Sequence, residues 1–344
     1  MPAGPPGVAR ALPWAGREPP RYPAAPQHGA GMHQPFTLAH LSDPHLPLSP
    51  GLAPSWRQLA SKRSLAFLSW RRKRGRAHSS AGLAALLADI AAARPDLVAV
   101  TGDLVNLALP GEFAAARDWL AELGPPARVV LVPGNHDALV PVPAAEGLDL
   151  WAPWLAGDAG PGFPSLRVRD GVAVLGLSSA VPTLPLLAGG RLGAAQVAAA
   201  ERMLGELGRR GLFRVVLVHH SPVAGPGGWR KALWDAGPLR DALARAGAEL
   251  VLHGHHHVRR FAVLPGPGGG RIPVLGVPAA ALGAHGGSWH RHVVAPDPAG
   301  GWWLDTERRA WDPARGGFRA AGRWRLHLAP GPPAARHGPA RPAA

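Results

Sequence analysis

The chain contains no cysteine. Disulfide bonds, thiolate metal ligands and thiol nucleophiles are therefore excluded, which fits a reducing compartment. Uncharged apolar runs long enough to cross a membrane are also absent, so we expect no spanning helix. Residues 1–35 lack the apolar segment behind a basic start that marks a secretory signal. These absences together predict a soluble, cytoplasmic protein.

Acidic residues are scarce, since 22 Asp and Glu stand against 37 Lys and Arg, for a formal net charge of +15. The excess lies in two places. Residues 57–76 hold eight Arg and Lys without an acid, and residues 307–344 hold eight Arg against two acids. The rest of the chain is nearly neutral, which favours a solvated segment and tail over a nucleic-acid surface. Peripheral membrane contact through 57–76 is a second interpretation of the basic segment.

The composition divides the chain into three parts. Residues 1–34 are rich in Pro, Ala and Gly without apolar periodicity, which predicts disorder. A globular domain is expected over 35–310, followed by a basic, Pro- and Arg-rich tail over 311–344. Within the domain, residues 46–79 form a basic insert with interspersed aromatic residues. We expect this insert to form a basic amphipathic helix over the mouth of the site.

Apolar runs of strand length alternate with helical patterns along the domain. The expected strands are 36–41, 97–101, 128–132, 172–177, 213–218, 249–252 and 272–277. The expected helices are 80–94, 111–123, 193–208 and 238–246. This alternation predicts an α/β layered core. Runs such as LVAV and VVLV lack polar alternation, so both faces of those strands should be buried.

Five of the expected strands end in clusters of His, Asp or Asn. In chain order these clusters contain Asp43 and His45; Asp103; Asn135, His136 and Asp137; His219 and His220; and His253, His255, His256 and His257. In α/β sheets, ligands bind outside the carboxyl ends of the strands. We therefore expect the five clusters to converge on one site.

The residue types in these clusters point to metal chemistry. Imidazole combined with carboxylate and amide oxygen suits Mn, Fe, Zn, Co or Ni better than Mg or Ca. Two such ions about 3.5–4 Å apart can hold the attacking and leaving oxygens of an in-line displacement. Two divalent ions, two Asp ligands and one bridging hydroxide leave a small positive charge, which matches an anionic phosphodiester. The clusters thus predict hydrolysis by an activated hydroxide without a protein nucleophile.

The ordered motifs resemble those of the calcineurin-like metallophosphoesterases. That family's pattern of D-x-H, G-D, G-N-H-D/E, H and G-H-x-H stands here as Asp43-Pro44-His45, Gly102-Asp103, Gly134-Asn135-His136-Asp137, His219 and Gly254-His255-His256-His257. The stretch 175–196 and the pair His219-His220 before Pro222 resemble the cyclic-nucleotide-phosphodiesterase-like branch. The resemblance covers about residues 36–294. It implies a two-sheet α/β/β/α sandwich with the site at the carboxyl ends of the strands.

The resemblance also implies a role for each motif residue. The first metal would be held by Asp43, His45 and His257, and the second by Asn135, His219 and His255. Asp103 would bridge the two ions, which would be divalent or mixed-valence Mn, Fe or Zn. His136 would contact the phosphate or protonate the leaving alkoxide, and Asp137 would orient the His136 ring.

Several histidines and one asparagine near the motifs are expected to be supports rather than ligands. His40 and His253 fall on strand positions and should be buried and hydrogen-bonded, or should orient a ligand. His256 is expected to make no direct metal contact. For His220 two roles stay open, contact with the substrate and support. Asn106 should order the loop after Asp103.

Three functions follow as hypotheses. The leading one is a phosphodiesterase that acts on a small phosphoester, such as a cyclic nucleotide or a glycerophosphodiester. The second is a hydrolase of phosphomonoesters or lipid-linked pyrophosphates that contacts a membrane surface through 57–76. The third is a nuclease or nucleic-acid-binding protein, which the charge distribution does not favour. The sequence carries no indication of oligomeric state.

Overall fold

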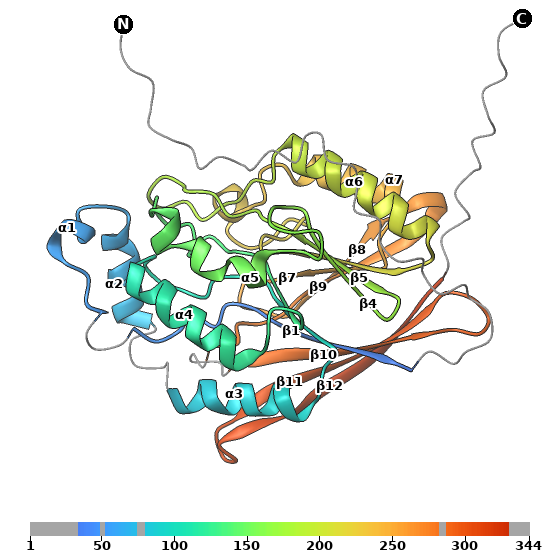
Figure 1. The fold of residues 1–344 in the computed structure, drawn as a ribbon, viewed down its shortest axis with the longest axis horizontal. Helices are drawn as coiled ribbons and strands as arrows, with labels where there is room; N and C mark the ends of the chain where they lie inside the picture. The colour runs from blue at the N-terminus through green and yellow to red at the C-terminus, as the bar shows by residue number, and fades with distance from the viewer. Residues whose placement is uncertain (1–33, 49–51, 74–79, 282–286, 330–344) are drawn as a thin grey trace, which may run out of the picture.

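The computed structural model describes residues 34–48, 52–73, 80–281 and 287–329 (Figure 1). Two six-stranded sheets form its centre. The first sheet has the order β12 (Gly317–Leu328), β11 (Trp302–Asp312), β10 (Ser288–Pro296), β1 (Phe36–Leu41), β2 (Leu97–Val100) and β3 (Val129–Leu131). The second has the order β4 (Ser165–Arg169), β5 (Val172–Leu177), β6 (Phe213–Val218), β7 (Leu250–His253), β9 (Arg271–Gly276) and β8 (Arg260–Pro265).

Each sheet combines a parallel part with antiparallel strands. β1, β2 and β3 pair in parallel, and so do β5, β6, β7 and β9. β10, β11 and β12 extend the first sheet in antiparallel fashion, while β4 and β8 close the two edges of the second. The carboxyl ends of parallel strands share one edge of a sheet. The loops after these strands are therefore brought together.

Helices cover the outer face of each sheet. α3 (Ser80–Ala92), α4 (Pro110–Leu123) and α5 (Ala152–Leu155) pack on the first sheet, and α6 (Ala194–Arg209) and α7 (Ala236–Ala246) pack on the second (Figure 1). A third apolar core lies between the sheets. The chain thus has the α/β/β/α sandwich that was expected from the motifs.

Strand alternation decides which core each side chain joins. On β1, Phe36 and Leu38 enter the core between the sheets, whereas Ala39 and Leu41 pack toward the helices. Burying one such Leu contributes about 1.5–3 kcal/mol. Because both faces of the parallel strands are covered, their sequences are continuously apolar, as the run of β2 predicted.

All seven expected strands and four expected helices are present, with ends within two residues of the expected positions. The strands that sequence patterns did not indicate are β4, β8, β10, β11 and β12. All five are antiparallel to a neighbouring strand, and the three longest, β10, β11 and β12, are rich in Arg, His and Trp. Their polar side chains interrupt the apolar signal that marks a strand.

The expected tail over 311–344 is wrong for residues 311–329. β11 continues to Asp312, and β12 pairs with it along its whole length. The Arg residues of this segment meet acids on the neighbouring strand: Arg325 Nε lies 2.6 Å from Asp305 Oδ1, and Arg323 Nε lies 2.6 Å from Glu307 Oε2. Cross-strand pairs of opposite charge stabilise a sheet. Many of the Arg residues that give this segment its positive charge therefore help to hold β11 and β12 together. Residues 330–344 and 1–33 lie outside the described residues.

The basic insert contains two helices, α1 (Trp56–Leu59) and α2 (Arg63–Lys73), at the left of Figure 1. Its polar residues anchor it: Lys62 Nζ lies 2.8 Å from the Leu187 carbonyl oxygen, and Arg63 Nε lies 2.9 Å from that of Leu107. Leu65 and Leu68 of α2 are instead exposed. The expectation of an amphipathic helix is therefore wrong, because a basic residue faces the protein and apolar ones face solvent. Residues 49–51 and 74–79 of the insert lie outside the described residues.

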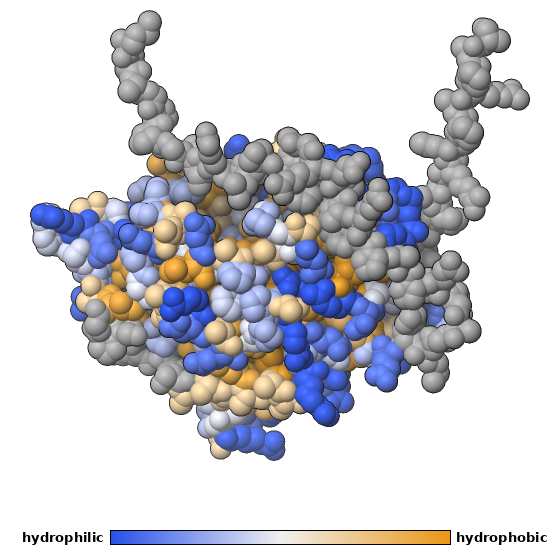
Figure 2. Space-filling model, viewed as in Figure 1, coloured by the Kyte–Doolittle hydropathy of each residue, from blue (hydrophilic) through white to orange (hydrophobic). Residues whose placement is uncertain are grey.

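Within the described ranges, helices are too short or too polar to cross a membrane. On the face seen in Figure 2, hydrophilic and apolar residues are interspersed rather than gathered into one apolar surface.

Candidate metal centre

The expected ligands lie just after five strand ends. Asp43 and His45 follow β1, Asp103 follows β2, Asn135 follows β3, His219 follows β6, and His255 and His257 follow β7. All are buried except His257, whose side chain is 35% exposed. The structure thus brings all seven residues to one edge of the sandwich, with one imidazole reaching toward solvent.

Four of these side chains form a first group. Asp43, His45, Asp103 and His257 offer ligand atoms that all lie within 4.8 Å of one another. His257 Nε2 lies 3.0 Å from Asp43 Oδ1 and 3.3 Å from His45 Nε2. His45 Nε2 lies 3.9 Å from Asp103 Oδ2. This group can hold one metal ion, with Asp103 at its inner side.

A second group lies on the other side of Asp103. His219 Nε2 lies 3.5 Å from Asp103 Oδ2 and 3.2 Å from Asn135 Oδ1. The rings of His219 and His255 have centroids 5.1 Å apart. Since one oxygen of Asp103 lies near ligands of both groups, Asp103 occupies the position of a bridging carboxylate.

His220 stands beside the second group but is occupied elsewhere. Its Nδ1 lies 2.8 Å from Ser179 Oγ, and its Nε2 lies 3.2 Å from the Ala188 carbonyl oxygen. Both ring nitrogens therefore have protein partners. Two roles were considered for His220, contact with the substrate and support. The structure favours the second, because His220 holds the loop around Ala188.

The hydrogen bonds of the ligand imidazoles fit bound cations. His219 Nδ1 lies 2.6 Å from the carbonyl oxygen of Thr101 and His45 Nδ1 lies 3.3 Å from that of Val105, and a carbonyl can only accept. Both Nδ1 atoms therefore carry the proton, and both Nε2 atoms present lone pairs to the other ligands. His255 Nε2 is buried and has no partner among the described residues. Lone pairs that converge in this way fit metal ions.

The backbone is strained at the ligands themselves. Asp43, His45, Asp103, His255 and His257 all have positive φ, from 41° to 70°. Such conformations in residues other than glycine cost about 1–3 kcal/mol each and gather at functional sites. Five of the seven expected ligands share this property, which supports a site selected for function rather than for stability.

Two motif glycines allow the loops to approach closely. A Cβ at Gly134 would lie 2.7 Å from His219 Cε1 and would overlap the Asp103 carboxylate, and a Cβ at Gly254 would lie 2.6 Å from Asp43 Oδ2. Any side chain at either position would displace a ligand. The glycines of the motifs are therefore required by the contact between loops.

Charges within the group favour a cation. Burial, together with the negative charges of Asp43 and Asp137, raises the pKa of Asp103 well above its usual value. Burial also opposes the ionisation of Asp43, but the imidazoles of His257, His219 and His45 hold its pKa well below the usual range. Burial lowers the pKa of His255, so this ring is neutral, as a ligand must be.

His136 lies at the open side of the centre. Its ring Nδ1 lies 2.8 Å from the Asn106 carbonyl oxygen, and its ring packs edge-on against His45 at a centroid distance of 4.9 Å. Nδ1 therefore carries a proton, and Nε2 is the ring nitrogen that faces away from this carbonyl. Its backbone N–H donates to Asp103 Oδ1 at 2.7 Å, which ties this residue to the bridging position.

The expectation that Asp137 orients the His136 ring is wrong. The Asp137 carboxylate accepts four backbone N–H groups, from Asp103, Leu104, Val105 and Gly134. It thereby holds the loop after β2 against the loop after β3. The orienting group for the ring is the Asn106 carbonyl, a backbone atom that residue types alone do not reveal.

The loop that presents this carbonyl is itself held by Glu112, another residue that the sequence did not indicate. Glu112 is buried at the start of α4 and accepts N–H groups of Asn106, Leu107 and Leu109. The side-chain amide of Asn106 donates to the Leu46 carbonyl at 2.7 Å, which agrees with its expected role in ordering the loop.

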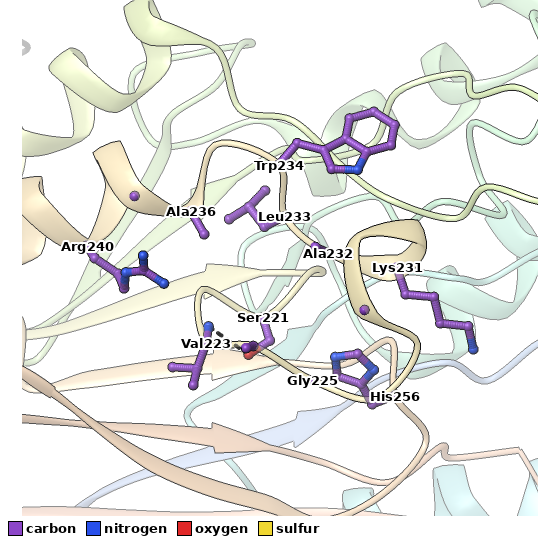
Figure 3. Close-up of a pocket in the computed structure, with 13 residues that line it drawn as sticks. Ser221, Val223, Gly225, Lys231, Ala232, Leu233, Trp234, Ala236, Arg240 and His256 are labelled. Atoms are coloured by element: carbon purple, nitrogen blue, oxygen red, sulfur yellow. Dashed lines mark hydrogen bonds between the residues drawn. The ribbon is translucent and has the colours of Figure 1, made fainter.

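A basic cavity adjoins the centre. It measures about 250 Å³ and is lined in part by His256, Lys231, Arg240, Ser221 and Trp234. Figure 3 shows Lys231 and His256 on one side of it and Arg240 on the opposite side. The His256 ring lies 5.0 Å from that of His255. The His256 side chain thus lies between the second metal group and the cavity. The motifs did not indicate the basic residues that line this cavity.

The family model described as calcineurin-like phosphoesterase matches residues 36–259. Among solved structures, a dimetal phosphatase from Danio rerio matches with a TM-score of 0.53 and 12% identity, over 86% of this chain and 100% of that one. A purple acid phosphatase from yellow lupin (Lupinus luteus) seeds matches with a TM-score of 0.53 and 12% identity, over 86% of this chain and 54% of that one. These two likenesses concern the fold.

One curated relative matches over a short stretch. This protein is the glycerophosphodiester phosphodiesterase GpdQ of Enterobacter lignolyticus, with 50% identity over 44 residues. The match spans 13% of this chain and 15% of the relative. It therefore supports the family, and the relative's substrate is no more than a suggestion for this chain.

Proposed function

This chain belongs to the calcineurin-like phosphoesterase family, and from this premise we propose that it is a phosphodiesterase acting on a small phosphodiester. The family makes it a metal-dependent phosphoester hydrolase, and its residues fit two metal ions. The observation that carries the finer proposal is the basic cavity beside the second metal group. A diester keeps one substituent on phosphorus after cleavage, and this cavity provides room for it.

The chain supplies two sets of ligands joined by Asp103. Asp43, His45 and His257 would hold one ion, and Asn135, His219 and His255 would hold the other. Nitrogen and oxygen donors of this kind suit Mn, Fe or Zn. When bound, the two ions would lower the pKa of a water molecule and neutralise charge on the phosphate. No side chain is then required as nucleophile.

His136 is placed to act on the leaving group. Because its Nδ1 donates to the Asn106 carbonyl, a proton for the departing alkoxide has to come from Nε2 of the imidazolium form. The Asn106 carbonyl dipole stabilises that positive charge. In the neutral form, the same Nε2 can accept a hydrogen bond. His136 therefore both contacts the substrate and controls a proton.

The cavity gives the substituent a charged environment. Lys231, Arg240 and His256 line it, and burial together with the positive charges of Arg260 and Lys231 lowers the pKa of His256 to about 4. His256 is thus a neutral hydrogen-bonding group at pH 7, and it lies in the same cavity as a Lys and an Arg. This combination suits a polar or anionic substituent. The likeness to a glycerophosphodiester phosphodiesterase is in keeping with such a substrate.

The proposal is tested by comparing bis(p-nitrophenyl) phosphate with p-nitrophenyl phosphate, with Mn²⁺ present. We expect faster hydrolysis of the diester, complete loss of activity with a chelator, and recovery when Mn²⁺ is restored. Activity that survives chelation would refute the metal mechanism. Hydrolysis of the monoester alone would replace the diesterase proposal with a phosphatase. The variant Lys231→Met should raise KM for an anionic diester but leave p-nitrophenyl phosphate hydrolysis unchanged.

A specific observation favours a second candidate, a hydrolase that acts at a membrane surface. Trp56 is 74% exposed, with the guanidinium of Arg57 over its ring, and Leu65 and Leu68 are also exposed. Exposed aromatic and apolar residues beside basic ones are typical of peripheral membrane contact. Sedimentation with anionic vesicles should be weakened by Trp56→Ala with Leu68→Ala, while the matched control Trp229→Ala, at another exposed Trp, should sediment as the wild type does.

A further inference from the structure

A second cluster of histidines lies inside the first sheet, away from the motifs. His40 belongs to β1, and His290 and His292 belong to β10. In the antiparallel register, His40 pairs with His290 and Leu38 pairs with His292. The strand alternation that sends Leu38 and Val294 into the core between the sheets sends the three imidazoles to that side as well. All three side chains are completely buried.

One ring nitrogen from each of the three residues lies within 4.8 Å of the other two, as the ligand atoms of the first metal group do. Four of their six ring nitrogens have no hydrogen-bond partner among the described residues: Nδ1 of His40, both nitrogens of His290, and Nε2 of His292. Buried polar atoms are almost always satisfied, so this concentration calls for an occupant.

Two threonines fix the orientation of two rings. His40 Nε2 lies 3.0 Å from Thr101 Oγ1, and His292 Nδ1 lies 2.9 Å from Thr306 Oγ1. When the ring N–H donates to the hydroxyl, the opposite nitrogen carries a lone pair. Those opposite nitrogens are the unpartnered ones. Metal-binding histidines typically have an outer partner of this kind on the second nitrogen.

The three rings are in the form that binds metal. Burial lowers the pKa of His292 to about 3. Burial and the neighbouring rings lower the pKa values of His40 and His290 well below the usual value, and the positive charge of Arg308 contributes at His290. The cluster is therefore neutral at pH 7, and it offers three lone pairs that do not have to lose a proton first.

We propose that His40, His290 and His292 bind a third metal ion, separate from the two of the catalytic centre. Three neutral imidazoles suit a divalent transition metal, with Zn²⁺ as the leading candidate, and leave one position for water or a small anion. Two further buried N–H donors without partners, Arg308 Nε and Trp324 Nε1, belong to residues beside His290. Because Arg308 is cationic, it favours an anion in the fourth position. The ion would join β1 to β10 and so stabilise the first sheet.

The third site shares no proposed ligand with the catalytic centre, and its test does not depend on the proposed function. The wild-type protein is loaded with Zn²⁺, freed of excess by gel filtration and measured for metal per chain. We expect three ions in the wild type, two in the double variant His290→Gln/His292→Gln, and one, that of the histidine cluster, in Asp103→Asn. The matched control is His327→Gln, which changes another histidine of the first sheet, paired with Asp297 at 2.8 Å, and should keep three ions.

Two ions in the wild type, or three in the double variant, would overturn the proposal. If the double variant does not fold, anomalous diffraction of the wild type at the zinc edge gives the answer. A peak between β1 and β10 supports the site, and electron density there without anomalous signal shows ordered water and overturns it. An empty catalytic centre beside an occupied histidine cluster would contradict the proposed function and leave the third site intact.

Discussion

The two histidine clusters of this protein use the same strand in opposite ways. β1 contributes His40 from within its regular hydrogen-bonded part, and then Asp43 and His45 from the loop that follows. Five of the seven loop ligands have positive φ, and the group includes carboxylates and one partly exposed imidazole, whereas the strand ligands are extended, all imidazole and completely buried. An open, strained and charged cluster can exchange substrate and product. A closed and neutral one can only stabilise the fold, so this comparison separates catalysis from stability.

The largest expected effect comes from Asp103→Asn. Asp103 Oδ2 lies within 4 Å of a histidine from each metal group, so the amide should weaken both sites at once. Loss of an outer partner costs about 10–100-fold in metal affinity, and loss of a shared ligand should cost more. Metal analysis and kcat should both fall steeply. Retention of one ion of the catalytic centre at full occupancy, in addition to the ion of the histidine cluster, would show that Asp103 does not bridge.

His136→Ala should separate metal binding from proton transfer. Its ring is not among the ligands, so metal content should stay unchanged. The rate for a diester with a poor leaving group should fall by about 10²–10⁴-fold, as is typical when a general acid is removed. An activated leaving group such as p-nitrophenolate should suffer less. Equal losses for both kinds of leaving group would contradict the assigned proton donor.

Asn135→Ala should distinguish the two catalytic sites from each other. Asn135 Oδ1 lies 3.2 Å from His219 Nε2, which places Asn135 in the second group. One ion should be depleted and the other retained, with affinity lowered about 10–100-fold at the affected site. Metal titration followed by activity gives the measurement. Simultaneous loss of both ions would mean that the groups cannot be occupied separately.

Glu112→Gln should weaken the open cluster through its loop rather than its ligands. The carboxylate accepts N–H groups of Asn106, Leu107 and Leu109, and the change should cost about 1–3 kcal/mol of stability. Because the Asn106 carbonyl holds His136, kcat should fall several-fold and the pH profile of kcat should shift, while metal content and KM stay unchanged. Thermal unfolding measures the loss of stability, and the pH dependence of kcat measures the effect on His136. A purely structural role would lower stability and leave the pH profile in place.

Arg309→Met should have the smallest effect and should spare both clusters. Arg309 of β11 pairs with Asp89 of α3 at 2.7 Å, on the helix side of the first sheet. Loss of this mostly buried pair, whose side chains are 23% and 13% exposed, should cost about 1–3 kcal/mol, measured by denaturant unfolding, with unchanged metal content and activity. Metal loss in this variant would show that both clusters respond to general loosening of the sheet. The distinction between a catalytic cluster and a stabilising cluster would then be wrong.

The catalytic centre was largely predictable from the sequence, for a physical reason. Its proposed ligands lie in loops after parallel strands, and the tight backbone contacts require glycines beside them. Residue type, order and spacing are therefore all constrained, and the seven expected ligands come together as predicted. What the sequence did not indicate are contributions of the backbone, such as the carbonyls of Thr101, Val105 and Asn106.

The histidine cluster in the first sheet was not predictable in the same way. His40 was expected to be buried and hydrogen-bonded, and it is both. Its meeting with His290 depends on pairing between β1 and β10, which are about 250 residues apart in the chain, and β10 carried no recognisable strand pattern. Antiparallel strands rich in charged and aromatic residues do not show the alternation of apolar and polar residues that marks a strand. For the same reason β11 and β12 were not predicted.

The strand order of the first sheet also bears on how this chain can be shortened. The family match ends at residue 259, but β10 pairs with β1 from Phe36 to His40, and β9 lies between β7 and β8 in the second sheet. A fragment cut at the end of the match would expose the unpaired edge of β1 and open the core beneath it. Exposed apolar edges of this kind recruit other chains. A shortened chain therefore has to keep β10, and versions that end at residue 259 should aggregate.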